Sequence, residues 1–220
     1  MIGNITLSRP WLELDLDASF RVLSWSINRP GFVETRRILW REVRNADLPR
    51  DLDVNQWLAS ELHARDSTSA VTFLTSRDIR AYHDVSATVE DVTVRCIATV
   101  GLSNAERIGT RLDRSAKDWG TINIAVVTDQ PLTDGARIEA LSLATQARTV
   151  AITEAGLDLP TGRASGTGTD CIAVAAAPVG DQCYAGMHTP LGEAVGSAVL
   201  QAVSVGATEW MDTVRREGEA

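Results

Sequence analysis

The feature that most constrains this chain is a polar loop that runs directly into an apolar, strand-like segment. Residues 164–170 read Ala-Ser-Gly-Thr-Gly-Thr-Asp, and the apolar string 171–177 follows at once. Glycine lets the backbone approach a ligand closely, while hydroxyl and carboxylate groups can donate, accept or take up a proton. A surface turn needs fewer polar groups than this. The pattern therefore indicates a functional site at the mouth of a buried strand.

Two earlier segments have the same construction. The run Ala98–Ala105 is apolar until it reaches Gly, Ser and Asn, and the run Gly120–Val127 carries Asn123 between two isoleucines. An amide inside a strand is unfavourable unless its hydrogen bonds are satisfied. We therefore expect the ends of several strands to build one polar pocket.

The remaining pattern predicts an α+β fold in which a mixed, largely antiparallel sheet is layered with three to four helices. The length fits a single domain over residues 1–220, with a frayed tail from about residue 213. Three of the six tryptophans, Trp25, Trp40 and Trp57, are expected in the core. Strands are predicted at 12–16, 20–27, 37–43, 69–74, 92–100, 121–127 and 170–177, a helical turn at 79–82, and helices after caps at Asp53, at Thr133 or Asp134, and at Thr189.

Composition argues against several classes of function. The net charge of −8 disfavours binding to nucleic acid, and no window approaches the eighteen apolar residues of a membrane span. The three cysteines show no metal-binding spacing, so neither a zinc site nor a disulfide is expected. The N-terminus lacks a signal-peptide pattern. We therefore expect a cytoplasmic protein, and leave open whether it forms a homo-oligomer.

Four segments give the chain a resemblance to the adenosylcobinamide amidohydrolase family. The family motifs V-G-L-S-N-A, G-T-I-N-I, T-G-T-x-T-D and G-x-H-T-x-L-G correspond to residues 100–105, 120–124, 166–170 and 186–192, in that order. A helix rich in alanine and threonine, 140–151, lies between the second and third motifs. The resemblance covers roughly the last two thirds of the chain and is loose over the first eighty residues.

One departure from the family is visible in that helix. The family often has Ala-Thr-Glu-Ala-Lys, whereas this chain has Ala144-Thr145-Gln146-Ala147-Arg148. No role that rests on the glutamate is therefore assigned here.

The resemblance implies hydrolysis of the amide that joins the corrin side chain of adenosylcobinamide to aminopropanol. The product would be adenosylcobyric acid, which serves corrinoid salvage in cobalamin biosynthesis. The partner would be a small-molecule corrinoid that carries its own cobalt. No further cofactor is expected, and a metal requirement stays open.

Amide hydrolysis needs a nucleophile or a positioned water, a proton acceptor, a proton donor for the leaving amine, and donors for the oxyanion. We expect Asp170 to act as base and His188 as acid or as its partner, while a threonine or serine hydroxyl could instead attack directly. Oxyanion donors would come from the amides of Asn104 or Asn123 and from the glycine N–H groups of the loop. The predicted catalytic residues are Asp170, His188, Asn123 and Thr169, and the predicted substrate-binding residues are Ser103, Asn104, Glu106, Gly166, Thr167 and Gly168.

Two other functions stay open at this point. A corrinoid-binding or carrier protein would use the same pocket without turnover. A phosphate-binding transferase could use the Gly-Thr-Gly-Thr loop, but phosphate transfer usually recruits Lys or Arg and a metal, and Arg163 is the only cation near the loop in sequence. Analysis of the reaction products distinguishes the three.

Overall fold

The computed structural model describes residues 2–44, 47–49, 51–113 and 120–215. In these ranges one eight-stranded sheet has the order β4-β3-β2-β12-β8-β6-β5, with β1 paired to β2. The strands of this sheet are β1 (Asn4–Ser8), β2 (Trp11–Ser24), β3 (Gly31–Glu42), β4 (Val71–Thr75), β5 (Tyr82–Val89), β6 (Val92–Val100), β8 (Ile122–Thr128) and β12 (Cys171–Ala176).

The helices and the short strands complete the described chain. Two small antiparallel pairs lie outside the main sheet, β7 with β11 and β9 with β10. The elements are α1 (Val54–Ala64), α2 (Asp134–Ala155), α3 (Pro190–Trp210), the 3-10 helix η1 (Ile79–Ala81), the π-helical turn η2 (Met211–Arg215), β7 (Ala105–Glu106), β9 (Asp158–Leu159), β10 (Gly162–Arg163) and β11 (Gly166–Thr167).

Two strand pairs of the main sheet are parallel, β3 with β4 and β8 with β12, and its other pairs are antiparallel. The chain passes from β8 to β12 by way of α2, as a parallel connection requires. In the β8–β12 pair, Cys171 lies opposite Asn123. Because parallel strands begin at the same edge of a sheet, the residues just before β8 and β12 become neighbours. This pairing therefore brings the polar segments before β8 and β12 to the same edge of the sheet.

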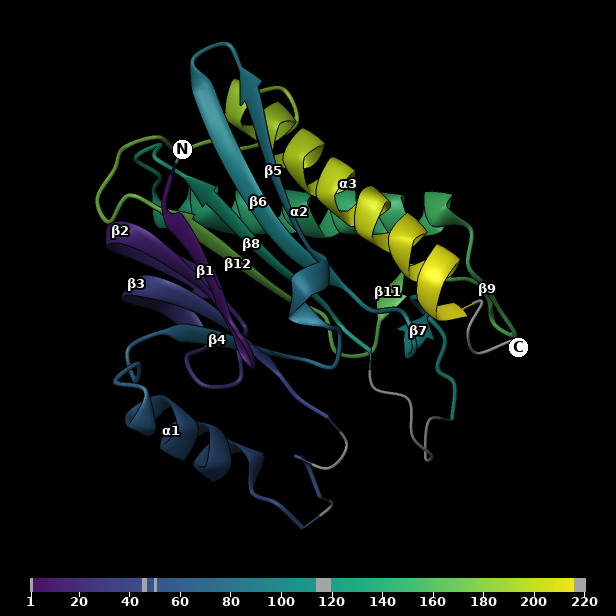
Figure 1. Ribbon diagram of the computed structural model, residues 1–220. Coiled ribbons are helices and arrows are strands. Elements are labelled where there is room, and N and C mark those ends of the chain that lie inside the picture. Colours follow the sequence, from purple (N-terminus) through teal and green to yellow (C-terminus); the bar gives the residue numbers. More distant parts are fainter. Residues whose placement is uncertain (1, 45–46, 50, 114–119, 216–220) are drawn as a thin grey trace.

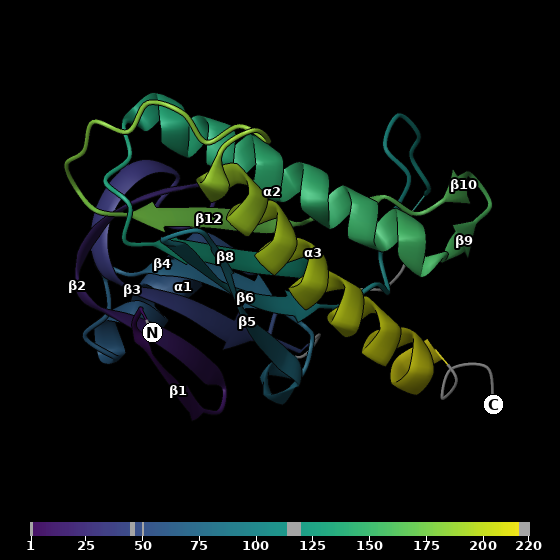
Figure 2. The same cartoon turned by 90° about the horizontal axis from the view of Figure 1, so that it is seen from above.

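The sheet separates two hydrophobic cores. On one face α2 and α3 lie side by side over β12, β8 and β6 (Figures 1 and 2), and small side chains such as Ala140, Ala144 and Ala198 let them approach closely. On the other face the sheet bends, so that side chains from β2, β3 and β4 meet those from β6, β8 and β12 in a second core. Representative members of this second core are Leu14, Phe20, Trp40, Phe73, Ile97 and Val127.

A third, smaller core lies on the outer side of β3. There α1 buries Leu58 and Leu62 against Leu39. Leu39 points away from the second core because its neighbours along the strand, Ile38 and Trp40, point into it. The helix therefore covers a face of the sheet that would otherwise be exposed and apolar.

The structure confirms the α+β class and the mostly antiparallel sheet. The helix caps follow the expected chemistry: the Asp53 carboxylate accepts from Asn55 N and Gln56 N, and the Thr133 hydroxyl, rather than Asp134, caps α2. Thr189 caps α3 by accepting from Gly192 N. Side-chain oxygens at these positions satisfy N–H groups that have no partner within the helix.

Other expectations were wrong or incomplete. The strands predicted at 12–16 and 20–27 belong to one long strand, β2, which ends at Ser24, so that residues 25–27 are not in a strand. The register of β2 against β3 shifts between Asp15 and Phe20. Trp25 is not in the core, because it is 44% exposed. Strands β1 and β5 were not anticipated. Of the predicted tail, residues 213–215 belong to η2, and residues 216–220 lie outside the described residues.

Candidate active site

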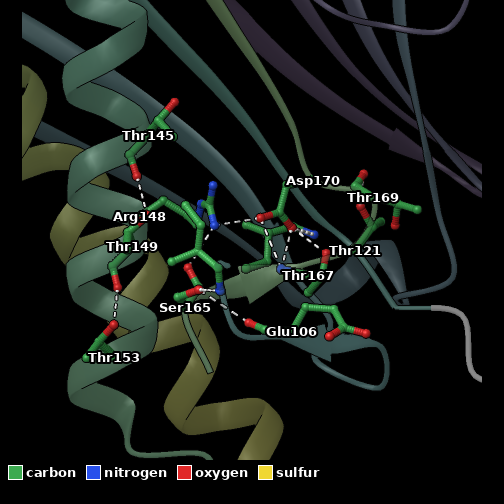
Figure 3. Close-up of polar contacts among 12 residues, drawn as sticks. Glu106, Thr121, Thr145, Arg148, Thr149, Thr153, Ser165, Thr167, Thr169 and Asp170 are labelled. Carbon is green, nitrogen blue, oxygen red and sulfur yellow. Dashed lines mark hydrogen bonds and ion pairs between the residues drawn. The ribbon is translucent and has the colours of Figure 1, made fainter. Parts of the chain in front are cut away.

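The three polar segments meet at the edge of the sheet where β8 and β12 begin (Figure 3). The Thr121 hydroxyl, just before β8, donates to the Thr169 carbonyl at 2.9 Å. The β7–β11 pair sets Gly166 opposite Glu106 and Thr167 opposite Ala105. Parallel pairing of β8 with β12 and the small β7–β11 pair therefore gather residues that lie up to about 65 positions apart in the sequence.

Asp170 is the centre of this cluster, and its side chain is only 7% exposed. The Oδ1 atom accepts from the backbone N–H groups of Thr167 and Ile122, each at 3.2 Å, and from the Thr167 hydroxyl. The Oδ2 atom lies 2.9 Å from Arg148 Nη1. Burial raises the pKa of Asp170, while Arg148, the Thr167 hydroxyl and the two N–H groups oppose that shift.

Arg148 reaches this carboxylate from α2 and also donates to the Ser165 carbonyl at 2.8 Å. The pair occupies the space next to Gly166, where a Cβ atom would lie 1.8 Å from Arg148 Nη1 and 2.7 Å from Asp170 Oδ2. Glycine is required at this position because any side chain would displace the ion pair.

The cation of the site is not the one nearest to the loop in the sequence. Arg163, the nearest cation along the chain, is exposed on β10 and lies 3.7 Å from Asp158. Arg148 occupies the cluster instead, because α2 packs across β12 and brings its side chain to the loop. Gln146, two residues earlier, is exposed and bonds to Ser142 on the same helix.

Asn104 and Thr169 form the outer part of the cluster. Asn104 Nδ2 donates to the Thr169 hydroxyl at 3.2 Å, and that hydroxyl donates to the Gly120 carbonyl at 3.1 Å. Asn104 Oδ1 and Arg148 Nε are buried and have no hydrogen-bond partner among the described residues. Asn104 Oδ1 can accept one further hydrogen bond, and Arg148 Nε can donate one.

The other predicted substrate-binding residues lie around this centre. Glu106 is half-buried, its carbonyl accepts from Ser165 N at 2.9 Å, and its Oε2 accepts from Leu112 N at 3.3 Å. Gly168 is exposed and donates its N–H to the Asn104 carbonyl at 3.3 Å. Ser103 is half-buried next to Gly120, where a Cβ would lie 2.7 Å from Ser103 N. The structure thus brings all six predicted binding residues to the same edge.

Asn123 lies beside the cluster but points into the second core, and it is 1% exposed. Its Nδ2 donates to the Leu74 carbonyl of β4 at 2.8 Å, and its Oδ1 accepts from the Thr121 hydroxyl at 3.3 Å. The amide thus joins two strands that the bend of the sheet brings together. The geometry gives Asn123 a structural partner and favours no donation to a substrate.

His188 does not join the cluster. It is exposed in the loop before α3, next to a turn in which Ala185 N donates to Glu139 Oε2 at 2.6 Å. Glu139 precedes Arg148 by nine residues on α2, a separation of roughly 14 Å along the helix axis. His188 and Asp170 therefore lie at opposite ends of this face of the sheet.

The segment around His188 has a structural explanation of its own. The Gly186 carbonyl accepts from the Thr189 hydroxyl at 2.8 Å, and that hydroxyl accepts from Gly192 N at 2.9 Å. A Cβ at Gly192 would lie 2.0 Å from the Gly186 carbonyl oxygen. The two glycines and the threonine thus build a tight start for α3, a requirement that does not involve the histidine.

In the described part of the chain, no group of three His, Cys, Asp or Glu side chains is placed to hold a metal ion, and no helix is long and apolar enough to cross a membrane. A surface hollow near the bend of β2 is lined by Asp15, Arg36 and their neighbours. It lies away from the Asp170 cluster, and these two side chains approach each other to 3.7 Å.

Comparison with known proteins gives a family match over almost the whole chain. A family model described as adenosylcobinamide amidohydrolase matches residues 2–215. An uncharacterized protein of Methanocaldococcus jannaschii is 39% identical over 90 residues, which are 40% of this chain and 35% of that protein. The match thus spans about a third of the length of that curated relative.

Among solved structures, a protein of Pyrococcus horikoshii aligns over 99% of this chain and 88% of its own, with a TM-score of 0.45 and 13% identity. A likeness at that level carries no inference about function.

The role of Asn123 leads to a first prediction. Replacing Asn123→Ala should lower the free energy of unfolding by roughly 1–3 kcal/mol, because the partly buried Leu74 carbonyl loses its donor. Whatever activity the native protein has should persist in the folded variant. Urea denaturation and an activity assay at a temperature where the variant is folded measure the two effects. A stable variant without activity would show that the amide acts on the substrate after all.

The buried ion pair leads to a second prediction. Arg148→Met should cost roughly 3–5 kcal/mol of unfolding free energy, because it leaves the Asp170 carboxylate buried without its counter-charge. Combining it with Asp170→Asn should cost clearly less than the sum of the two single changes, and Arg148→Lys, which keeps the charge, is the matched control. Denaturation of all four variants measures the coupling. Additivity within about 0.5 kcal/mol would mean that the two groups are independent.

Proposed function

The chain belongs to the adenosylcobinamide amidohydrolase family, and we propose that it hydrolyses the amide between the corrin side chain and aminopropanol of adenosylcobinamide. The products would be adenosylcobyric acid and free aminopropanol. The observation that carries the proposal is the Thr167 hydroxyl, which donates to a buried carboxylate, Asp170, that is itself held by Arg148. A hydroxyl, an acceptor for its proton and a cation are the groups that acyl transfer requires.

The geometry favours Thr167 over a water molecule as the nucleophile. Both carboxylate oxygens of Asp170 already accept hydrogen bonds, and the side chain is 7% exposed. A water would have to displace one of these bonds to be activated. The Thr167 hydroxyl, in contrast, already points at Asp170 Oδ1, and a carboxylate whose pKa burial has raised is a stronger base than an exposed one.

The reaction can be written with these groups alone. Thr167 Oγ1 attacks the amide carbon while its proton passes to Asp170. The C–N bond then breaks, the proton leaves Asp170 with the amine of aminopropanol, and an ester to Thr167 remains. Water attacks that ester, Asp170 accepts the water's proton, and the proton returns to Thr167 Oγ1 as the corrin carboxylate departs.

The developing oxyanion needs donors that are not already engaged. The Gly168 N–H donates to the Asn104 carbonyl, which makes it a poor candidate. Arg148 Nε has no partner among the described residues, and Asn104 Nδ2, which gives one N–H to the Thr169 hydroxyl, carries a second N–H. We assign these two groups to the oxyanion, in place of Asn123. His188 has no step in this scheme.

The proposal predicts that the purified protein converts adenosylcobinamide without added nucleotide. Mass spectrometry of the corrinoid should show the loss of mass that matches release of aminopropanol, and free aminopropanol should appear in equal amount. Binding of the corrinoid without any mass change at high protein concentration would instead support a carrier. Conversion only when a nucleotide is added would support a transferase.

The choice of nucleophile gives a separate prediction. Thr167→Val should lower kcat by at least about 10³-fold, because it removes the attacking oxygen, while Thr167→Ser should keep measurable turnover. Thr169→Val is the matched control, since the Thr169 hydroxyl is engaged with the Gly120 carbonyl, and should lose less than about tenfold in kcat. Circular dichroism checks the fold of each variant. Equal losses for the two valine variants would rule out Thr167 as the specific nucleophile.

A further inference from the structure

Trp25 is an exposed aromatic residue fixed next to the Asp170 cluster. It follows the last residue of β2, and β2 pairs with β12 so that Ser24 lies opposite Ala173. Its indole Nε1 donates to the Asp170 carbonyl at 2.7 Å. The polar atom of the ring is therefore satisfied by the protein, yet the residue is 44% exposed.

A second apolar residue just after β2 is exposed as well. Ile27, two positions later, is 43% exposed, and neither it nor Trp25 belongs to any of the three hydrophobic cores. Other tryptophans differ in this respect: Trp11, Trp40 and Trp210 are buried, and Trp57 packs against the third core. Among the described tryptophans, Trp25 is thus the one whose ring is not packed in or against a hydrophobic core.

The proposed substrate supplies a reason for an exposed ring at this place. Its reacting amide hangs at the rim of a broad, conjugated macrocycle, so the macrocycle must rest on the protein surface next to the nucleophile. Aromatic side chains offer such rings a stacking surface. The hydrogen bond from Trp25 to the Asp170 backbone fixes that surface relative to the loop that carries Thr167.

We propose that Trp25 is the platform on which the corrin macrocycle stacks when the substrate binds beside the Asp170 cluster. This inference rests on the proposed function, because it takes its ligand from it. Stacking far from the reacting bond stabilises the bound substrate and the transition state alike. Loss of the platform should therefore act on Kd and KM and leave kcat nearly unchanged.

The test compares Trp25→Ala with Trp25→Phe in the full chain. Tyr184→Ala serves as the matched control, since Tyr184 is 73% exposed in the loop that precedes His188. Equilibrium dialysis, read from the corrin absorbance, gives the Kd for cobinamide without any need for turnover. Steady-state assays then give kcat and KM, and melting curves check the fold.

Trp25→Ala should raise Kd and KM about 10- to 100-fold, the effect expected for loss of one stacked aromatic face. Trp25→Phe, which keeps an aromatic face and loses the N–H, should stay within about threefold of the native Kd. Tyr184→Ala should bind like the native protein.

Three results would overturn the platform: an unchanged Kd in Trp25→Ala, an equal loss in Trp25→Phe, or no binding of cobinamide by the native protein. An equal loss in Trp25→Phe would assign the role to the Asp170 hydrogen bond. If the native protein binds cobinamide without hydrolysing it and Trp25→Ala weakens that binding, the proposed hydrolysis fails while the platform stands. If hydrolysis occurs and Trp25→Ala binds normally, the platform alone fails.

Discussion

The buried contact between Asp170 and Arg148 is the interaction on which the rest of the site depends. It joins α2 to the loop before β12, and it fills the space that a side chain at residue 166 would need. The same carboxylate orients the Thr167 hydroxyl and holds Ile122 N at the start of β8. One charged group thus fixes a helix, two strand ends and the proposed nucleophile, and its burial shifts its pKa in the direction that favours proton acceptance.

The fold supplies this contact through one parallel strand pair. Because β8 and β12 begin at the same edge, the segment before each strand can contribute polar groups to one cluster, and α2 must cross back over the sheet between them. The bend of the sheet matters as well, because it brings β4 next to β8. The Asn123 side chain points into the second core and donates to the Leu74 carbonyl of β4. Without β4 beside it, this buried amide would have no such partner.

Features that depend on local chemistry could be predicted from the sequence, and features that depend on contacts between distant residues could not. Helix caps and the polar strand ends follow from residue types within a few positions, and their locations agree with the structure. The contacts of Arg148 and Trp25 with Asp170 were missed, because each residue meets Asp170 only after strand order and helix packing are set. His188 and Asn123 were grouped with Asp170 by motif, yet a helix start explains the first segment and a bond between strands explains the second residue.

The central claim is that the cluster around Asp170 holds the amide that is cleaved. A crystal structure of the Thr167→Val variant with cobinamide bound tests this most directly, because the substrate cannot turn over. The account predicts that the amide carbon lies about 3–3.5 Å from the side chain at residue 167, the distance for attack, with the macrocycle against Trp25. A corrinoid bound beside His188 at the start of α3, with its amide out of reach of residue 167, would contradict it.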